Sequence, residues 1–204
     1  MIAVDPLGHG ESDKPHDPGE YFLQSLDSDI VTVLDAEQVD RVLVWGFSMG
    51  LVHGASLAVL HPSRVAGLVC GGGAPVVNLE GRRERLLAHA DLIRTDEGMT
   101  AFLEGVGATD ETIAESLGRN DSAALSAALA GEAEWFPDVG DLAAPSLWYV
   151  GSDDGDGFTG KERELAERFG VETHLIPHAD HVASFRRASD VIPIVEPFLG
   201  RHHV

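Results

Sequence analysis

The residues best suited to chemistry are a serine and its two flanking glycines, in the run GFSMG at residues 46–50. A short apolar segment precedes this run and a helical pattern at 49–60 follows it, so the sequence predicts a strand, a sharp turn and a helix. Such a turn brings the backbone on its two sides close together, which favours glycine at both flanking positions. It would expose the hydroxyl of Ser48 as a nucleophile, near a helix N-terminus that favours negative charge. A serine that only caps the following helix is the structural alternative.

A nucleophilic serine needs a base, and the base needs a carboxylate that orients it. Two later loops can supply these groups in the order acid, then histidine. Each loop follows a strand-like apolar run, at 146–150 and at 172–176. The candidate acids and bases in the two loops are Asp153, Asp154 and Asp156, then His178 and His181. The residue types alone leave the choice within each loop open.

The segments around these residues alternate between strand and helix patterns. Strands are predicted at 1–5, 42–45, 65–70, 146–150 and 172–176, and helices at 22–37, 49–60, 161–169 and within 189–199. Pro197 should bend or end the last helix. This alternation predicts the α/β class, with a mostly parallel, doubly wound sheet of about five strands that helices cover on both faces.

The alternation stops between residues 76 and 137. The stretch has no strand pattern, and it contains short helical patterns at 82–94, 97–103, 111–117 and 123–130. We therefore predict a helical insertion at 76–137, and an α/β core made of residues 1–75 and 138–204. Trp135 and Phe136 near the end of the insertion indicate an apolar pocket. Together with Phe47, they are the residues we assign to substrate binding.

Composition limits the partners and the location. The 204-residue chain has a net charge of −20, which disfavours nucleic acid and anionic membranes as partners. No run approaches the eighteen or so apolar residues of a membrane span, and the N-terminus lacks a signal-peptide pattern, so a cytoplasmic location is expected by default. Cys70, the single cysteine, lies in an apolar run and is predicted to be buried. The histidines lack metal-ligand spacing, so we expect no metal site.

Four ordered motifs together resemble the α/β-hydrolase family. The run MIAVDPLGHGESDKP at 1–15 is similar to the family's D-x-x-G-x-G-x-S-x-x-P strand and loop, and residues 46–50 match its nucleophile elbow. Residues 151–154 are similar to its acid loop, and residues 176–181 to its histidine loop. The resemblance covers nearly the whole chain, with the helical insertion in the place of the family's variable cap. It implies a sheet of the α/β-hydrolase type.

The resemblance implies a role for each candidate. Ser48 is the nucleophile, Asp154 is the acid in preference to Asp153, and His181 is the base in preference to His178. The implied reaction is hydrolysis of a carboxylic ester, a lactone or a related acyl bond in a small molecule, without a cofactor. The alternatives are a carbon–carbon bond hydrolase, a haloperoxidase-like member of the same fold, and a truncated, non-catalytic relative.

One departure from the family pattern concerns the beginning of the chain. Residues 1–5 resemble the family's fourth strand, so three opening strands and one of the two oxyanion donors would be missing. The backbone N–H of Met49 is the donor that remains. A late gene start, a fragment, or a sheet completed by another chain would each explain this. In the last case, the exposed edge would support self-association.

Overall fold

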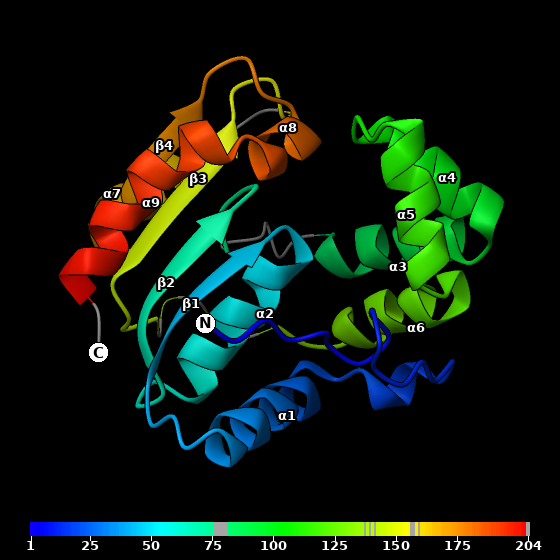
Figure 1. The fold of residues 1–204 in the computed structure, drawn as a ribbon, viewed down its shortest axis with the longest axis horizontal. Coiled ribbons are helices and arrows are strands. Elements are labelled where there is room, and N and C mark those ends of the chain that lie inside the picture. Colours follow the sequence, from blue (N-terminus) through cyan, green and yellow to red (C-terminus); the bar gives the residue numbers. More distant parts are fainter. Residues whose placement is uncertain are drawn as a thin grey trace. The chain divides into compact units, whose positions relative to one another are not determined.

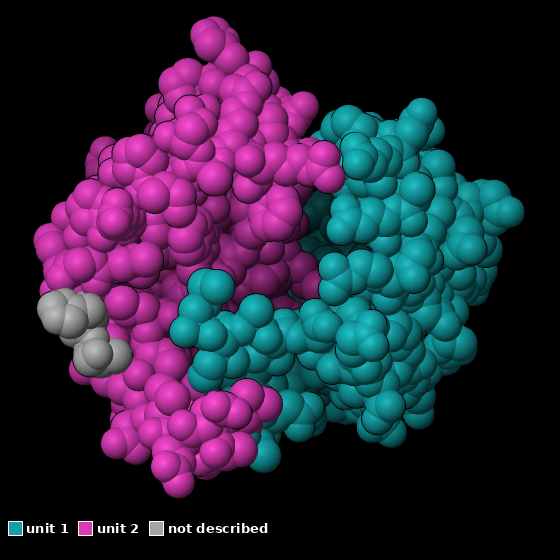
Figure 2. Space-filling model, viewed as in Figure 1, with its two compact units in different colours: residues 1–32, 78–136 teal, residues 33–77, 137–204 magenta. Residues whose placement is uncertain are grey.

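The computed structural model describes residues 1–75, 81–136, 138, 140, 142–155, 158 and 160–202 (Figure 1). The chain forms two compact units, which Figure 2 shows in teal and magenta. Residues 1–32 and 78–136 make up the first unit, and residues 33–77 and 137–204 make up the second. None of the described helices is long and apolar enough to cross a membrane.

The second unit is built on a parallel sheet whose strands follow one another in sequence order. They are β1 (Val42–Phe47), β2 (Val65–Gly71), β3 (Ser146–Gly151) and β4 (Glu172–Ile176). β2 and β3 are buried along their whole length, as expected for central strands with both faces covered. The parallel α/β architecture predicted from the sequence is therefore confirmed.

The described sheet has four strands where the sequence predicted about five, and the difference lies at residues 1–5. These residues are exposed and form no strand. The loop after them is held by turns, in which the N–H of His9 donates to the Pro6 carbonyl at 2.9 Å and the Ser12 hydroxyl to the Asp5 carbonyl at 2.7 Å. A β-branched run has only a tendency to form a strand, because a strand also needs a neighbour for its backbone hydrogen bonds.

Two helices of this unit pack on opposite faces of the sheet. α2 (Met49–Leu60) packs on β1 and β2, with Gly54 close to Leu68. α9 (Ala188–His202) packs on the other face, against a core that includes Val69. The two faces follow from strand geometry, because neighbouring side chains such as those of residues 68 and 69 point in opposite directions. α7 (Gly160–Phe169) connects the loop after β3 to β4.

α9 continues beyond the proline that we expected to bend or end it. Pro193 and Pro197 both lie inside the helix, which extends to His202, so an end at Pro197 is wrong. Each interior proline removes a backbone hydrogen bond and destabilises a helix by about 3 kcal/mol. Burial of one helix face offsets that cost, through Val191, Val195 and Phe198.

The first unit is helical, as the patterns between residues 82 and 130 predicted. Its helices are η1 (Pro18–Glu20), α3 (Arg82–Ile93), α4 (Asp96–Gly105), α5 (Asp110–Arg119) and α6 (Ser122–Glu132). α1 (Leu23–Ala36) begins in this unit, and its residues after 32 belong to the second.

Residues 1–32 group with the helical unit, whereas the sequence placed them in the α/β core with the rest of 1–75. A small core explains the grouping, since Tyr21 and Leu26 pack with Ala127 and Ala128 of α6. The Tyr21 hydroxyl also donates to the Pro15 carbonyl at 2.7 Å, and burial raises the pKa of Tyr21 to about 12. The contacts of Tyr21 and Leu26 with α6 join residues about a hundred positions apart, so local sequence patterns could not reveal them.

Candidate active site

Ser48 lies in the turn between β1 and α2 with backbone angles of φ 52° and ψ −115°. A positive φ is rare for a residue with a side chain, and such strain is found at functional sites. A Cβ atom at Gly46 would overlap the carbonyl oxygen of Gly50, so the turn requires glycine there. The Ser48 side chain makes no capping hydrogen bond to α2, which argues against the alternative in which this serine only caps the helix.

The elbow is anchored to the sheet and leads directly into a helix. The N–H of Ser48 donates to the Gly71 carbonyl at the end of β2, at 2.9 Å. Met49 is the first residue of α2, and the N–H groups of a first turn have no carbonyl partner within their helix. These N–H groups, together with the helix dipole, favour an anion beside Ser48.

His181 and Asp154 form a hydrogen bond of 2.7 Å between Nδ1 and Oδ2. Asp153 has a different partner, because its Oδ1 accepts from the Ser152 hydroxyl at 2.9 Å. His178 is exposed, and its backbone N–H donates to the same Ser152 oxygen at 2.8 Å. When Nδ1–H of a neutral imidazole donates to a carboxylate, the other ring nitrogen, Nε2, is the proton acceptor. The geometry therefore pairs one carboxylate with one histidine and orients that histidine as a base.

Backbone contacts join the acid loop to the histidine loop. The N–H of Ser152 donates to the Ile176 carbonyl at 2.9 Å, and that of Asp153 to the Ala179 carbonyl, also at 2.9 Å. A Cβ atom at Gly151 would overlap the Ala179 carbonyl oxygen, so the close approach of the two loops requires glycine at this position. These main-chain contacts therefore fix the positions of Asp154 and His181 relative to one another.

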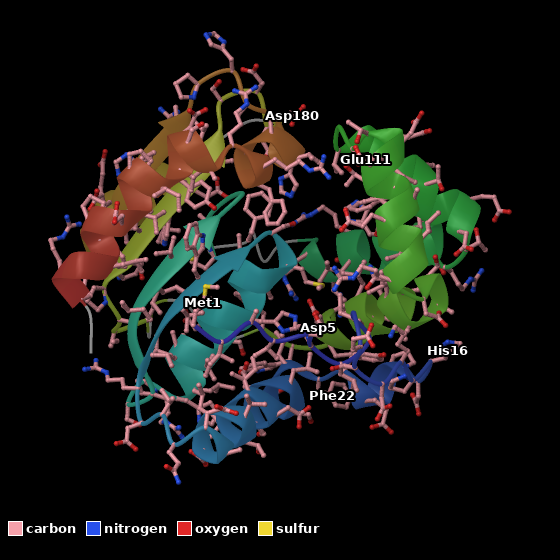
Figure 3. All side chains as sticks on the ribbon, in the orientation of Figure 1. Met1, Asp5, His16, Phe22, Glu111 and Asp180 are labelled. Carbon is pink, nitrogen blue, oxygen red and sulfur yellow. The ribbon has the colours of Figure 1, made fainter. Side chains whose placement is uncertain are left out.

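His181 begins a short helix that was not predicted from the sequence, α8 (His181–Arg186). Its N-cap is Asp180, which Figure 3 labels and whose side chain accepts from the N–H of Ala183 at 2.7 Å. The Ser184 hydroxyl donates to the His181 carbonyl at 2.9 Å. An aspartate before a short helical run is an N-cap signal, so this helix could have been recognised from the sequence.

Phe47, which we assigned to substrate binding, packs against the histidine. Its ring centroid lies 4.9 Å from that of His181, 5.1 Å from that of Phe185 and 6.4 Å from that of Tyr149. Because Phe47 directly precedes Ser48, these contacts bring the histidine ring to the elbow. Phe185 was not predicted from the sequence, since its position depends on α8.

Trp135 and Phe136, the other residues assigned to binding, belong to the first unit and are half-buried there. The guanidinium of Arg82 lies 4.7 Å from the ring centroid of Phe136. Arg82 is buried and donates to the Glu132 carbonyl at 3.0 Å, and burial lowers its pKa. Phe136 therefore packs on a cation of its own unit, and a binding role for either aromatic residue stays a prediction.

Other features of the described residues do not form part of this arrangement. No group of three or more His, Cys, Asp or Glu side chains among them could hold a metal ion, and Asp156 lies outside the described part of the chain. Two cavities of about 290 and 510 Å³ lie beside α7 and β4, and neither is lined by Ser48, Asp154 or His181. Cys70 is fully buried in β2, and burial raises the pKa of its thiol.

Comparison with known proteins agrees with the fold. A family model described as "alpha/beta hydrolase fold" matches residues 1–95, a range that includes Ser48. The chain belongs to the α/β-hydrolase family.

The names of proteins related to this α/β hydrolase describe several different activities. A putative 2-succinyl-6-hydroxy-2,4-cyclohexadiene-1-carboxylate synthase of Bacillus subtilis (strain 168) is 32% identical over 164 residues, covering 72% of this chain and 57% of the relative. The 3-oxoadipate enol-lactonase 2 of Acinetobacter baylyi is 25% identical, covering 98% of this chain and 79% of the relative. The solved structure of Est816, described as an N-acyl homoserine lactone degrading enzyme, has a TM-score of 0.74 at 26% identity, covering 96% of this chain and 81% of that chain.

Proposed function

We propose that this α/β hydrolase cleaves a carboxylic ester, a lactone or a related acyl bond through a triad of Ser48, His181 and Asp154. The observation that carries the proposal is the 2.7 Å hydrogen bond between Asp154 and His181, whose ring packs on the residue before the strained Ser48. A nucleophile, a base and an orienting acid are the groups that acyl transfer requires. Three separate segments supply them, each at the carboxyl end of a parallel strand.

The acylation step follows from these roles. Nε2 of His181 takes the proton of the Ser48 hydroxyl as Oγ attacks the substrate carbonyl carbon, and Asp154 stabilises the imidazolium that forms. The carbonyl π electrons move to oxygen, where the N–H of Met49 donates to the oxyanion. Collapse of this intermediate releases the alcohol, which takes the proton from His181.

The deacylation step repeats these roles with water. His181 removes a proton from a water molecule that attacks the acyl-enzyme, and the proton then returns to Ser48 as the carboxylic acid leaves. Every proton is carried by His181, so the proposed reaction needs neither a metal nor a cofactor.

Lactones are the substrate class to test first. The names of two relatives, an enol-lactonase and an N-acyl homoserine lactone degrading enzyme, support this choice. In a lactone the acyl and leaving groups belong to one molecule, so hydrolysis gives a single hydroxy acid that is easily identified. A third relative is named as a putative synthase and not as a hydrolase. The carbon–carbon bond hydrolase considered from the sequence is the alternative outcome.

The deciding experiment compares the wild-type chain with the Ser48→Ala variant. We expect wild-type hydrolysis of p-nitrophenyl acetate or γ-butyrolactone to fall by about 10⁴-fold or more in the variant, because the nucleophile is lost. Initial rates measure the effect, and circular dichroism establishes that both proteins are folded. Ser28→Ala is the matched control, since this serine is exposed on α1.

Two results would contradict the proposal. One is a folded wild-type chain that hydrolyses neither substrate. The other is a Ser48→Ala variant that still reacts with a serine-directed fluorophosphonate to the wild-type extent.

A further inference from the structure

Phe185 is a large apolar side chain that lies mainly in water, with 64% of its surface exposed. It belongs to α8, four residues after His181, and residues four apart lie on the same face of a helix. Packing in the core of the unit therefore does not explain its position.

One further ring connects Phe185 to the proposed active site. Phe47 contacts both of these side chains of α8, with its centroid 5.1 Å from that of Phe185 and 4.9 Å from that of His181. Phe47 is half-buried and directly precedes Ser48. An apolar surface made by two aromatic rings thus begins beside both the nucleophile and the base.

We propose that Phe185 and Phe47 form an apolar subsite that binds the alkyl or aryl chain of the substrate next to Ser48. This inference rests on the proposed function, and it narrows the substrate class to esters or lactones with a medium-length apolar chain. Each methylene group that leaves water favours binding by about fourfold, so the two rings would favour a longer chain over an acetyl group. Aromatic side chains suit this role because they offer a large contact area with few rotatable bonds.

The first test measures kcat/KM for p-nitrophenyl hexanoate and for p-nitrophenyl acetate. We expect Phe185→Ala to lower the hexanoate-to-acetate ratio by about tenfold, mainly through KM, and Phe185→Leu to keep most of the ratio because it keeps apolar surface. Phe169→Ala is the matched control, since Phe169 is an exposed phenylalanine at the end of α7. A ratio that Phe185→Ala leaves unchanged, or that Phe169→Ala lowers equally, would overturn the subsite.

A second test measures ligand binding at the subsite in the absence of hydrolysis. Saturation-transfer NMR would compare hexanamide with acetamide as ligands of the Ser48→Ala variant, with and without Phe185→Ala. We expect hexanamide to bind more tightly than acetamide, and this preference to fall several-fold when Phe185 is removed. Equal binding of the two amides in both variants would overturn the subsite. If the wild type lacks activity while the preference for hexanamide is present, the proposed chemistry fails and the apolar subsite stands.

Discussion

Asp153 and Asp154 are neighbours with different partners, which makes them a matched pair for testing the triad. Asp154 bonds to His181, whereas Asp153 accepts from Ser152. We expect Asp154→Asn to lower kcat by about 10²- to 10⁴-fold, because an amide at this position no longer holds the useful tautomer or stabilises the imidazolium. Asp153→Asn should stay within about threefold of the wild type.

Measurements of kcat on folded variants, with the same ester for all three proteins, check this prediction. An Asp153→Asn variant as slow as Asp154→Asn would mean that the orienting role does not belong to Asp154 alone. Thermal unfolding of both variants separates a loss of kcat from a loss of folding, because Asp153 is exposed whereas Asp154 is half-buried.

At the scale of single residues, the sequence predicted best those residues whose backbone geometry is determined by a local motif, such as Ser48. Gly46 allows the elbow, so the motif itself carried that information, whereas a Cβ atom at Gly50 would meet nothing within 4 Å. The preference for Asp154 and His181 came from the family resemblance, and the structure pairs these two residues. Phe185 was missed because its contact with Phe47 depends on a helix that begins at the histidine.

At the scale of elements, α6 offers a test of how capping depends on pH. Asp121 is its N-cap and accepts from the N–H of Ala124 at 3.0 Å, while His16 lies 3.1 Å away. The hydrogen bond from Ala124, followed by the contact with His16, lowers the pKa of Asp121. A carboxylate whose pKa is lowered by folding stabilises the folded state above its unfolded pKa of about 3.9, and this contribution is lost as the pH falls through the lower folded pKa.

We therefore expect Asp121→Ala to reduce the free energy of unfolding by about 1 kcal/mol at pH 7, with the difference shrinking below about pH 4. Asp121→Asn is the control, because asparagine is an equally good N-cap that does not titrate. Urea unfolding of the three proteins between about pH 3 and pH 7 measures the effect. An Asp121→Ala variant whose deficit is constant down to pH 3 would show that the ionised carboxylate has no special role.

The elements themselves were predictable where one pattern extended over several residues. The ranges of β1, α2 and β2 follow apolar runs and a helical pattern that the sequence shows directly. The errors at residues 1–5 and at Pro197 share a cause, because both depend on what the segment packs against or pairs with. Local propensity contains no information about such a neighbour.

At the scale of the whole molecule, the edges of the sheet and the net charge have opposite effects on association. β1 pairs with β2 on one side and is an edge of the described sheet, and Trp45 on this strand is 42% exposed. An edge strand offers backbone groups to another chain, whereas a net charge of −20 keeps two copies apart. We propose that a second copy pairs along β1 once salt screens this repulsion.

The corresponding prediction is that the chain is monomeric at low ionic strength and dimerises as salt is added, because the screening length falls from about 30 Å at 0.01 M to about 3 Å at 1 M. Trp45→Lys should remain monomeric at both, since lysine on an edge strand opposes pairing. Ile192→Lys, which places the same charge at an equally exposed apolar position of α9, should associate like the wild type. Sedimentation velocity distinguishes the species. A wild type that stays monomeric in high salt, or an Ile192→Lys variant that blocks association as well as Trp45→Lys does, would rule out β1 as the interface.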